Sequence, residues 1–123
     1  MGWSKAWLPK KPGAQAKPKA RRGVPNGVEQ QHGAWLSGLK QIGEIRDYGF
    51  EVITLRPIPT VTYTPDYTVW MKDGSVEYHE TKGYEIHEAT IVRMKLCANR
   101  FTHATFRLYQ YERGKDRKER LIT

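Results

Sequence analysis

The chain is poor in cysteine and lacks the common motifs of thiolate and zincin metal sites. Cys97 is the single cysteine among 123 residues, so no internal disulfide can form, and this usage fits a reducing cytoplasm. Neither CxxC nor HExxH occurs, which leaves a zinc site of either type without support. No apolar run approaches the roughly 18 residues that cross a bilayer, and the basic N-terminus lacks the apolar core of a secretory signal. We therefore expect a cytoplasmic protein with no membrane contact.

Acidic side chains are missing from residues 1–25, which carry seven basic side chains and four of the seven prolines. The rest of the chain holds 14 basic and 13 acidic residues, so the net charge of +8 belongs mainly to this segment. It cannot bury enough apolar surface to offset its ordering entropy. We predict a disordered basic arm over 1–25 and one domain over 26–123.

A basic arm of this kind can lie along nucleic-acid phosphates. The alternative is a solubilising tail or a segment that binds a protein partner. The predicted DNA-binding residues of the arm are Lys10, Lys11, Lys17, Lys19, Arg21 and Arg22.

Two helices are predicted in the domain. Asn26 is a suitable N-cap for the first, and Gly43 is placed to end it. The second runs roughly over 87–99. The first helix has one apolar face, which is formed at helical spacing by Val28, His32, Trp35, Leu36, Leu39 and Ile42. On this face His32 is interpreted as a partly buried core histidine rather than a metal ligand.

Strands are predicted between and after these helices. An alternating β-branched run predicts a strand over 50–55, which the prolines at 57 and 59 confine to an edge or a bend. A short strand over 61–63 leads into the next segment. A last strand is predicted over 105–111, and the charged end at 112–123 is expected to be solvated.

The segment between Thr64 and Gly83 predicts a β-hairpin that carries acidic side chains. Glu80 and Lys82 are two residues apart on its second strand and share a face. A two-residue turn would place Asp66 on the opposite face. A three-residue loop with Gly74 in the left-handed conformation instead places Asp66 directly across from Glu80. A shared site therefore requires this bulged loop or a bend at Asp66.

The two ends of this hairpin, Tyr63-Thr-Pro-Asp66 and Glu80-Thr-Lys82-Gly83, resemble the PD-(D/E)XK nuclease superfamily. The likeness is to its small phage-encoded members and to Holliday-junction-resolving endonucleases. It implies an α/β fold with a restriction-endonuclease-like αβββαβ core over roughly 26–111, in which helices flank a mixed central sheet. In a phage-encoded protein the compartment would be the host cytoplasm.

The resemblance also implies the roles of individual residues. Asp66, Glu80, Thr81 and Glu29 would hold Mg²⁺, for which Mn²⁺ would substitute. Lys82 would orient or activate water, and Lys95 on the second helix matches a basic residue of the family. The catalytic set is then Asp66, Glu80, Lys82, Glu29 and Lys95. Hard Mg²⁺ prefers such oxygen ligands and retains several waters.

Each of these residues also has a simpler interpretation. Glu29 can favour the helix dipole, Lys95 can extend its ammonium to water, and Glu80 and Lys82 can form an exposed strand pair. Because Pro65 precedes Asp66 and Gly83 follows Lys82, we favour the nuclease interpretation.

The function expected from the resemblance is a Mg²⁺-dependent endodeoxyribonuclease for branched or structured DNA, of the junction-resolvase type used in recombination. The resemblance allows a homodimer, which no feature of this sequence specifies. The alternatives are a phage nicking or restriction-like nuclease, and an inactive nucleic-acid-binding protein on the same scaffold. A protein that binds acidic partners through the basic arm would show no metal dependence.

Overall fold

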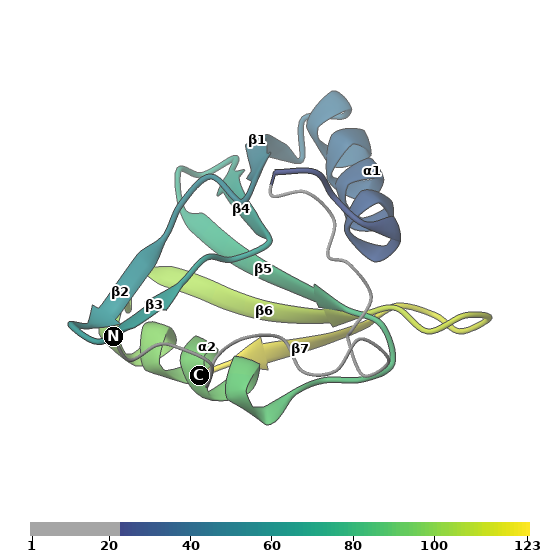
Figure 1. Cartoon of the computed structure of the whole chain (residues 1–123). Helices are drawn as coiled ribbons and strands as arrows, with labels where there is room; N and C mark the ends of the chain where they lie inside the picture. Colours follow the sequence, from purple (N-terminus) through teal and green to yellow (C-terminus); the bar gives the residue numbers. More distant parts are fainter. Residues whose placement is uncertain (1–22) are drawn as a thin grey trace.

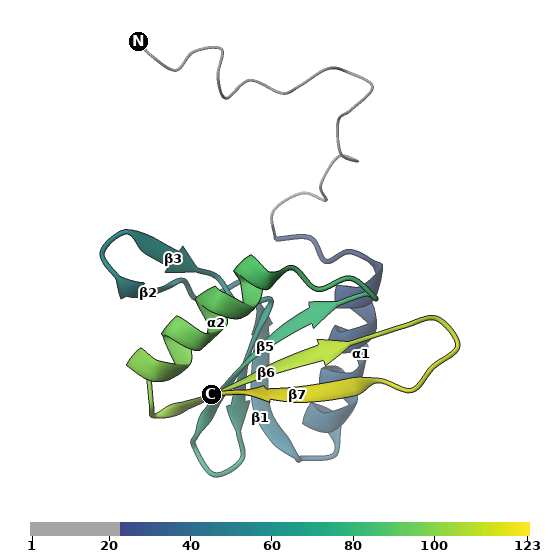
Figure 2. The same cartoon turned by 90° about the horizontal axis from the view of Figure 1, so that it is seen from below.

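The computed structural model describes residues 23–123, which form an α/β fold with one main sheet between two helices (Figures 1 and 2). The predicted arm residues at 1–22, among them all six predicted DNA-binding side chains, lie outside the described residues. In chain order the elements are α1 (Gly27–Gln41), β1 (Ile45–Phe50), β2 (Leu55–Ile58), β3 (Val61–Tyr63), β4 (Tyr67–Met71), β5 (Val76–Lys82), α2 (Glu88–Arg100), β6 (Ala104–Gln110) and β7 (Lys118–Ile122).

The main sheet is mixed and has the strand order β1-β4-β5-β6-β7. β5 and β6 run parallel, and α2 connects them, while the other neighbouring pairs are antiparallel. β2 and β3 form a separate two-stranded sheet beside α2 (Figure 2). Among residues 23–123, no helix has both the length and the apolar character required to cross a membrane.

Side-chain alternation on β6 shows how both faces of the sheet are covered. Phe106 and Leu108 are buried in the cluster that also contains Met94 of α2. Tyr109 points to the other face, where its ring lies 4.6 Å from the ring of His32 on α1. The strand predicted over 105–111 is thus confirmed as β6, and α1 and α2 lie on opposite sides of the sheet (Figure 1).

The first helix begins and ends as predicted. The Asn26 side chain accepts a hydrogen bond from the Glu29 backbone N–H at 2.9 Å, and Glu29 Oε1 accepts one from the Asn26 N–H at 2.8 Å. This reciprocal pair satisfies two amides that the first turn cannot pair internally. Gly43, at φ +80°, follows the C-terminal cap.

Two strand predictions were wrong. The strand expected over 50–55 lies instead at β1, and a positive φ of 51° at Glu51 ends it. A β-bulge between Ile45 and Asp47 shifts the alternation, so that Ile45, Tyr48 and Phe50 all pack toward α1 and the sequence pattern is obscured.

The C-terminal segment was also mispredicted, since 112–123 is not entirely solvated and β6 is not the last strand. β7 pairs with β6, and Ile122 is buried, only 2% exposed. An edge strand with one covered face can carry many charges, which explains why the pattern read as solvated.

Of the two hairpin arrangements that allow a shared site, the structure has the three-residue bulged loop. The Met71 N–H donates to the Ser75 carbonyl at 2.8 Å, the Gly74 N–H donates to the Met71 carbonyl at 3.0 Å, and Gly74 has a φ of +93°. Tyr67 pairs with His79, and one further step in the same register places Asp66 across from Glu80. The three-residue bulged loop therefore brings the two carboxylates together.

Candidate active site

The candidate site is built around two buried carboxylates, Asp66 and Glu80, which are 8% and 6% exposed. Asp66 lies immediately before β4, and its Oδ2 accepts hydrogen bonds from the Thr81 N–H at 2.8 Å and the Thr81 hydroxyl at 3.0 Å. Glu80 Oε1 accepts the Tyr63 hydroxyl at 2.6 Å. The Lys82 ammonium lies 3.5 Å from Glu80 Oε2. Asp66 is thus held by β5, and Glu80 is held by β3 of the two-stranded sheet.

Burial and mutual repulsion make this pair difficult to ionise. Burial, followed by the charge of Glu80, raises the pKa of Asp66 from 3.8 to about 8. Burial likewise raises the pKa of Glu80, although the Tyr63 hydroxyl and Lys82 oppose the shift. Two buried carboxylates that resist ionisation need a further positive charge beside them, which a proton or a cation can supply.

The raised pKa of Asp66 predicts that stability falls with pH. The folded state holds a proton between about pH 4 and pH 8 that the unfolded chain has released, so unfolding becomes easier as pH rises through this window. Unfolded histidines titrate around pH 6.5 and act in the opposite direction, so the contribution of Asp66 is the difference between the wild type and Asp66→Asn, which we expect to be about 2 kcal/mol between pH 6.5 and pH 8. Urea unfolding in EDTA measures this slope. The curve of Asp66→Asn should lack this loss over the same range, and a slope equal to that of the wild type would contradict the assignment.

Glu29 lies near enough to the pair for its charge to act on Asp66. Its carboxylate is engaged in the cap of α1, and its charge contributes to the raised pKa of Asp66, after burial and Glu80. Within residues 23–123, no group of three or more His, Cys, Asp or Glu side chains is arranged to hold a metal ion. The structure thus gives Glu29 a capping role in the first turn of α1, and its role as a metal ligand stays a prediction.

Lys95 lies on an exposed part of α2, and no ion pair among the described residues includes it. Thr81 positions Asp66 through its backbone N–H and hydroxyl. The catalytic role of Lys95 and the ligand role of Thr81 stay predictions.

The donor atoms of the pair fit a divalent cation. Carboxylate oxygens are the ligands that Mg²⁺ and Mn²⁺ favour, and Mg²⁺ keeps several of its waters, so two carboxylates suffice. Asp66 Oδ1 accepts no hydrogen bond from residues 23–123, whereas Oδ2 is held by Thr81. One oxygen of Asp66 is therefore fixed and the other remains available.

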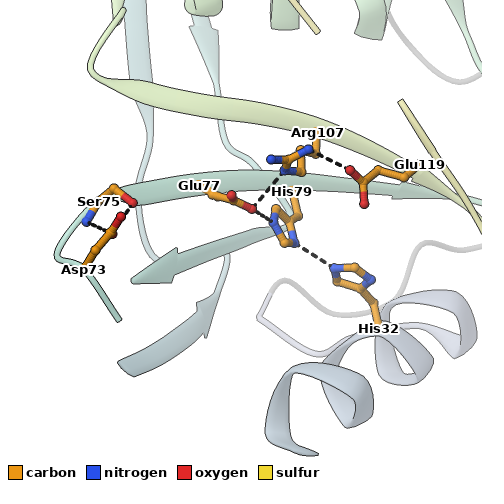
Figure 3. Close-up of polar contacts among 7 residues, drawn as sticks. All are labelled: His32, Asp73, Ser75, Glu77, His79, Arg107 and Glu119. Carbon is orange, nitrogen blue, oxygen red and sulfur yellow. Dashed lines mark hydrogen bonds and ion pairs between the residues drawn. The ribbon is translucent and has the colours of Figure 1, made fainter. Parts of the chain in front are cut away.

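Sequence reasoning missed a chain of polar side chains between α1 and the sheet (Figure 3). His32 Nε2 lies 2.9 Å from His79 Nδ1, and His79 Nε2 lies 2.9 Å from Glu77 Oε1. Arg107 Nε donates to the same Glu77 oxygen at 3.1 Å and its Nη1 to Glu119 Oε2 at 2.6 Å. His32 and His79 are 0% and 2% exposed, so this chain is part of the core.

The direction of each hydrogen bond in this chain follows from Glu77. Burial lowers the pKa of His32 to about 3 and also lowers the pKa of His79, so both rings are neutral at pH 7. The Glu77 carboxylate only accepts, so His79 Nε2 carries the proton and His79 Nδ1 accepts from His32 Nε2. His32 Nδ1 then accepts the Tyr111 hydroxyl. The chain thus runs in one direction from Tyr111 to Glu77.

One signal for this chain is present in the sequence. Glu77 and His79 alternate with Tyr78 and Glu80 on β5, so they must point to the face opposite the carboxylate pair. Their partners come from α1, β6 and β7, whose positions the sequence pattern does not give. The interpretation of His32 as a core histidine is confirmed.

Tyr67, next to Asp66, fixes the start of α1 against the sheet. Its hydroxyl donates to the Glu29 carbonyl at 2.7 Å. A Cβ atom added at Gly33 would lie 2.5 Å from this hydroxyl. Only a residue without a side chain lets α1 approach so closely.

Gly33→Ala and Gly38→Ala are expected to have opposite effects on stability. Gly33→Ala must displace the buried Tyr67 hydroxyl, at a net cost of about 1–3 kcal/mol. Among the described residues, an added Cβ at Gly38 meets no atom within 4 Å outside its own helix and neighbours, so alanine should gain about 0.5–1 kcal/mol. Urea unfolding of both variants tests this pair, and equal effects would contradict the packing described for α1.

Comparisons with known proteins add little to this geometry. No protein-family model matches the chain, and no curated protein matches it. A crystal structure of SSO0001 is similar, with 15% sequence identity and a TM-score of 0.46. The match covers 77% of this chain and 50% of that one, so this chain spans about half the length of its structural neighbour.

Proposed function

We propose that this protein is a Mg²⁺-dependent endodeoxyribonuclease that hydrolyses phosphodiester bonds in branched or structured DNA. The observation that carries the proposal is the buried pair of Asp66 and Glu80 with the Lys82 ammonium beside it. A structural ion pair would not need a second buried carboxylate, since the repulsion between the two acids costs stability until a cation binds.

The order of elements supports the nuclease interpretation. Taken along the main sheet, the chain runs α1, β1, β4, β5, α2 and β6, which is the αβββαβ order of the restriction-endonuclease-like core. Relative to that core, β2 and β3 form an insertion before Asp66, and β7 extends the sheet. The insertion contributes Tyr63, whose hydroxyl holds Glu80.

The residues of the site have distinct roles in the proposed reaction. Asp66 and Glu80 would hold Mg²⁺, which when bound stabilises negative charge on the phosphate and lowers the pKa of nearby water. Thr81 and Tyr63 fix the two carboxylates by donating hydrogen bonds to one oxygen of each. The Lys82 ammonium donates to the attacking water or to a phosphate oxygen, where charge develops.

The proposal is tested by incubating the full chain with a labelled four-way junction, a flapped duplex, a plain duplex and a single strand. With Mg²⁺ or Mn²⁺ we expect cleavage of the branched DNA in preference to the plain duplex, and no cleavage in EDTA. Preferential cleavage of plain duplex would instead favour a restriction-like or nicking enzyme. Binding without cleavage of any of these DNAs would contradict the proposal and favour an inactive DNA-binding protein.

A further inference from the structure

A cavity of about 780 Å³ lies at the end of the sheet where β5 and β6 stop, and its lining includes Gly83, the residue after Lys82. It is bounded by the start of α1 at Gly27 and Val28, by Gly83 and Tyr84 directly after Lys82, and by the β6–β7 connection from Tyr111 to Asp116. Figure 1 shows this connection extending beyond the sheet, past the tip of β5 and below the start of α1. The cavity therefore begins one residue after the proposed catalytic lysine.

The walls of this cavity are tied to the site and to the core. The Tyr111 N–H donates to the Lys82 carbonyl at 2.8 Å. The Tyr111 hydroxyl donates to His32, at the end of the chain of buried hydrogen bonds. Gln110 Nε2 donates to the Tyr84 carbonyl at 2.9 Å. These hydrogen bonds fix the positions of Tyr84 and Tyr111, on two sides of the cavity, relative to Lys82.

The side chains around the cavity suit one class of ligand. Tyr84 is 79% exposed, although a large aromatic side chain gains by being covered. The segment 112–118 has four basic and two acidic side chains. Lys115 and Lys118 both pair with Glu112, whereas Arg113 forms no ion pair with any of residues 23–123. An exposed aromatic ring and an arginine without an ion pair among residues 23–123, on the walls of one cavity, are the combination that binds single-stranded nucleic acid.

The occupant must be an unpaired strand rather than a duplex. In a double helix both faces of each base are covered by its neighbours, so a protein ring can stack only on a base that has left the helix. A cavity of this size is in the range that holds small-molecule ligands, so it takes roughly one or two nucleotides and excludes a duplex.

We propose that this cavity binds the unpaired DNA strand next to the scissile phosphate, with a base stacked on Tyr84 and a phosphate on Arg113. The inference rests on the proposed function and narrows it, because the preferred substrate would carry a single-stranded segment beside the cleaved bond, as a flap or an open junction does. The basic residues of the arm remain unchanged in every variant below.

The test is a fluorescence anisotropy titration of the full chain with a labelled single strand and with a plain duplex, in EDTA so that nothing is cleaved. Tyr84→Ala should lower affinity for the single strand about tenfold or more, and Tyr84→Phe should retain it, because stacking needs only the ring. Arg113→Gln should lower the same affinity and reduce its salt dependence by about 0.7 in the logarithmic slope. Arg46→Gln, which removes an exposed arginine on β1 at the far edge of the sheet, is the matched control.

An effect of Tyr84→Ala that is equal on single strand and duplex, or absent on both, would overturn the proposal. A loss with Arg46→Gln as large as with Arg113→Gln would do the same. Because the titration needs no catalysis, it separates the two claims. Tyr84-dependent single-strand binding in a protein that cleaves nothing would support the cavity as a single-strand site and contradict the proposed nuclease activity. Cation-dependent cleavage of branched DNA without that binding would support the nuclease activity and contradict the proposed role of the cavity.

Discussion

Replacing Asp66 with asparagine is expected to lower the rate of Mg²⁺-dependent DNA cleavage by at least about 100-fold. The amide keeps the shape of the side chain and an oxygen for the Thr81 hydrogen bonds, but it removes one of the two charges that hold the cation. Cation catalysis is worth several kcal/mol of transition-state stabilisation, and each 1.36 kcal/mol is a factor of ten in rate. Single-turnover cleavage of the best substrate at saturating enzyme measures the effect.

The same variant should bind DNA at least as well as the wild type, because it removes a negative charge near the phosphates. Asp47→Asn is the control, since it removes an equal charge from an exposed carboxylate whose one ion pair within residues 23–123 is with Lys40. Cleavage by Asp66→Asn at more than a tenth of the wild-type rate, or an equal loss in Asp47→Asn, would show that the site has been misplaced.

His32→Leu is expected to cost about 2–5 kcal/mol of folding stability at pH 7. Leucine leaves His79 Nδ1 without its donor and the Tyr111 hydroxyl without its acceptor, and each unsatisfied buried group costs about 1–3 kcal/mol. This is a large part of the stability of a small domain. His103→Leu, at an exposed position, should change stability by less than about 0.5 kcal/mol. Urea unfolding with circular dichroism compares the two.

The loss in His32→Leu should also depend on pH. The folded state keeps His32 neutral down to about pH 3, whereas the unfolded chain takes up a proton near pH 6.5. The stability due to a neutral His32 is therefore fully present above pH 6.5 and is lost as pH falls toward 3. The variant should show a shallower loss of stability than the wild type between pH 6.5 and 4. Parallel curves would contradict a buried, neutral His32.

The hairpin was predictable because its turn chemistry is local. Gly74 after Asp73 predicts a left-handed residue, and the alternation on either side limits the hairpin to two registers, of which the three-residue loop is the one that forms. Asp66 and Glu80 follow from that register alone. The start of α1 was equally predictable, since Asn26 and Glu29 have the spacing of a capping box.

The remaining parts of the fold depend on contacts between distant segments. The bulge in β1 hides its alternation, and β7 carries charges that a strand tolerates only because β6 pairs with it and one face stays open. The buried chain needs His32, His79 and Arg107 from three elements, and no sequence pattern relates their positions. The cavity beside Tyr84 arises in the same way, from three segments that meet only in the folded chain.

The central claim is that Asp66 and Glu80 together bind a divalent cation, and cation-linked thermal stability tests it without knowledge of the DNA substrate. At pH 8 a saturating concentration of Mn²⁺ should raise the Tm of the wild type by about 5 °C or more over its value in EDTA. At pH 5.5 the shift should be smaller, because protons compete for the pair. Asp66→Asn should show little shift at either pH. No shift in the wild type at pH 8, or an equal shift in Asp66→Asn, would contradict the claim.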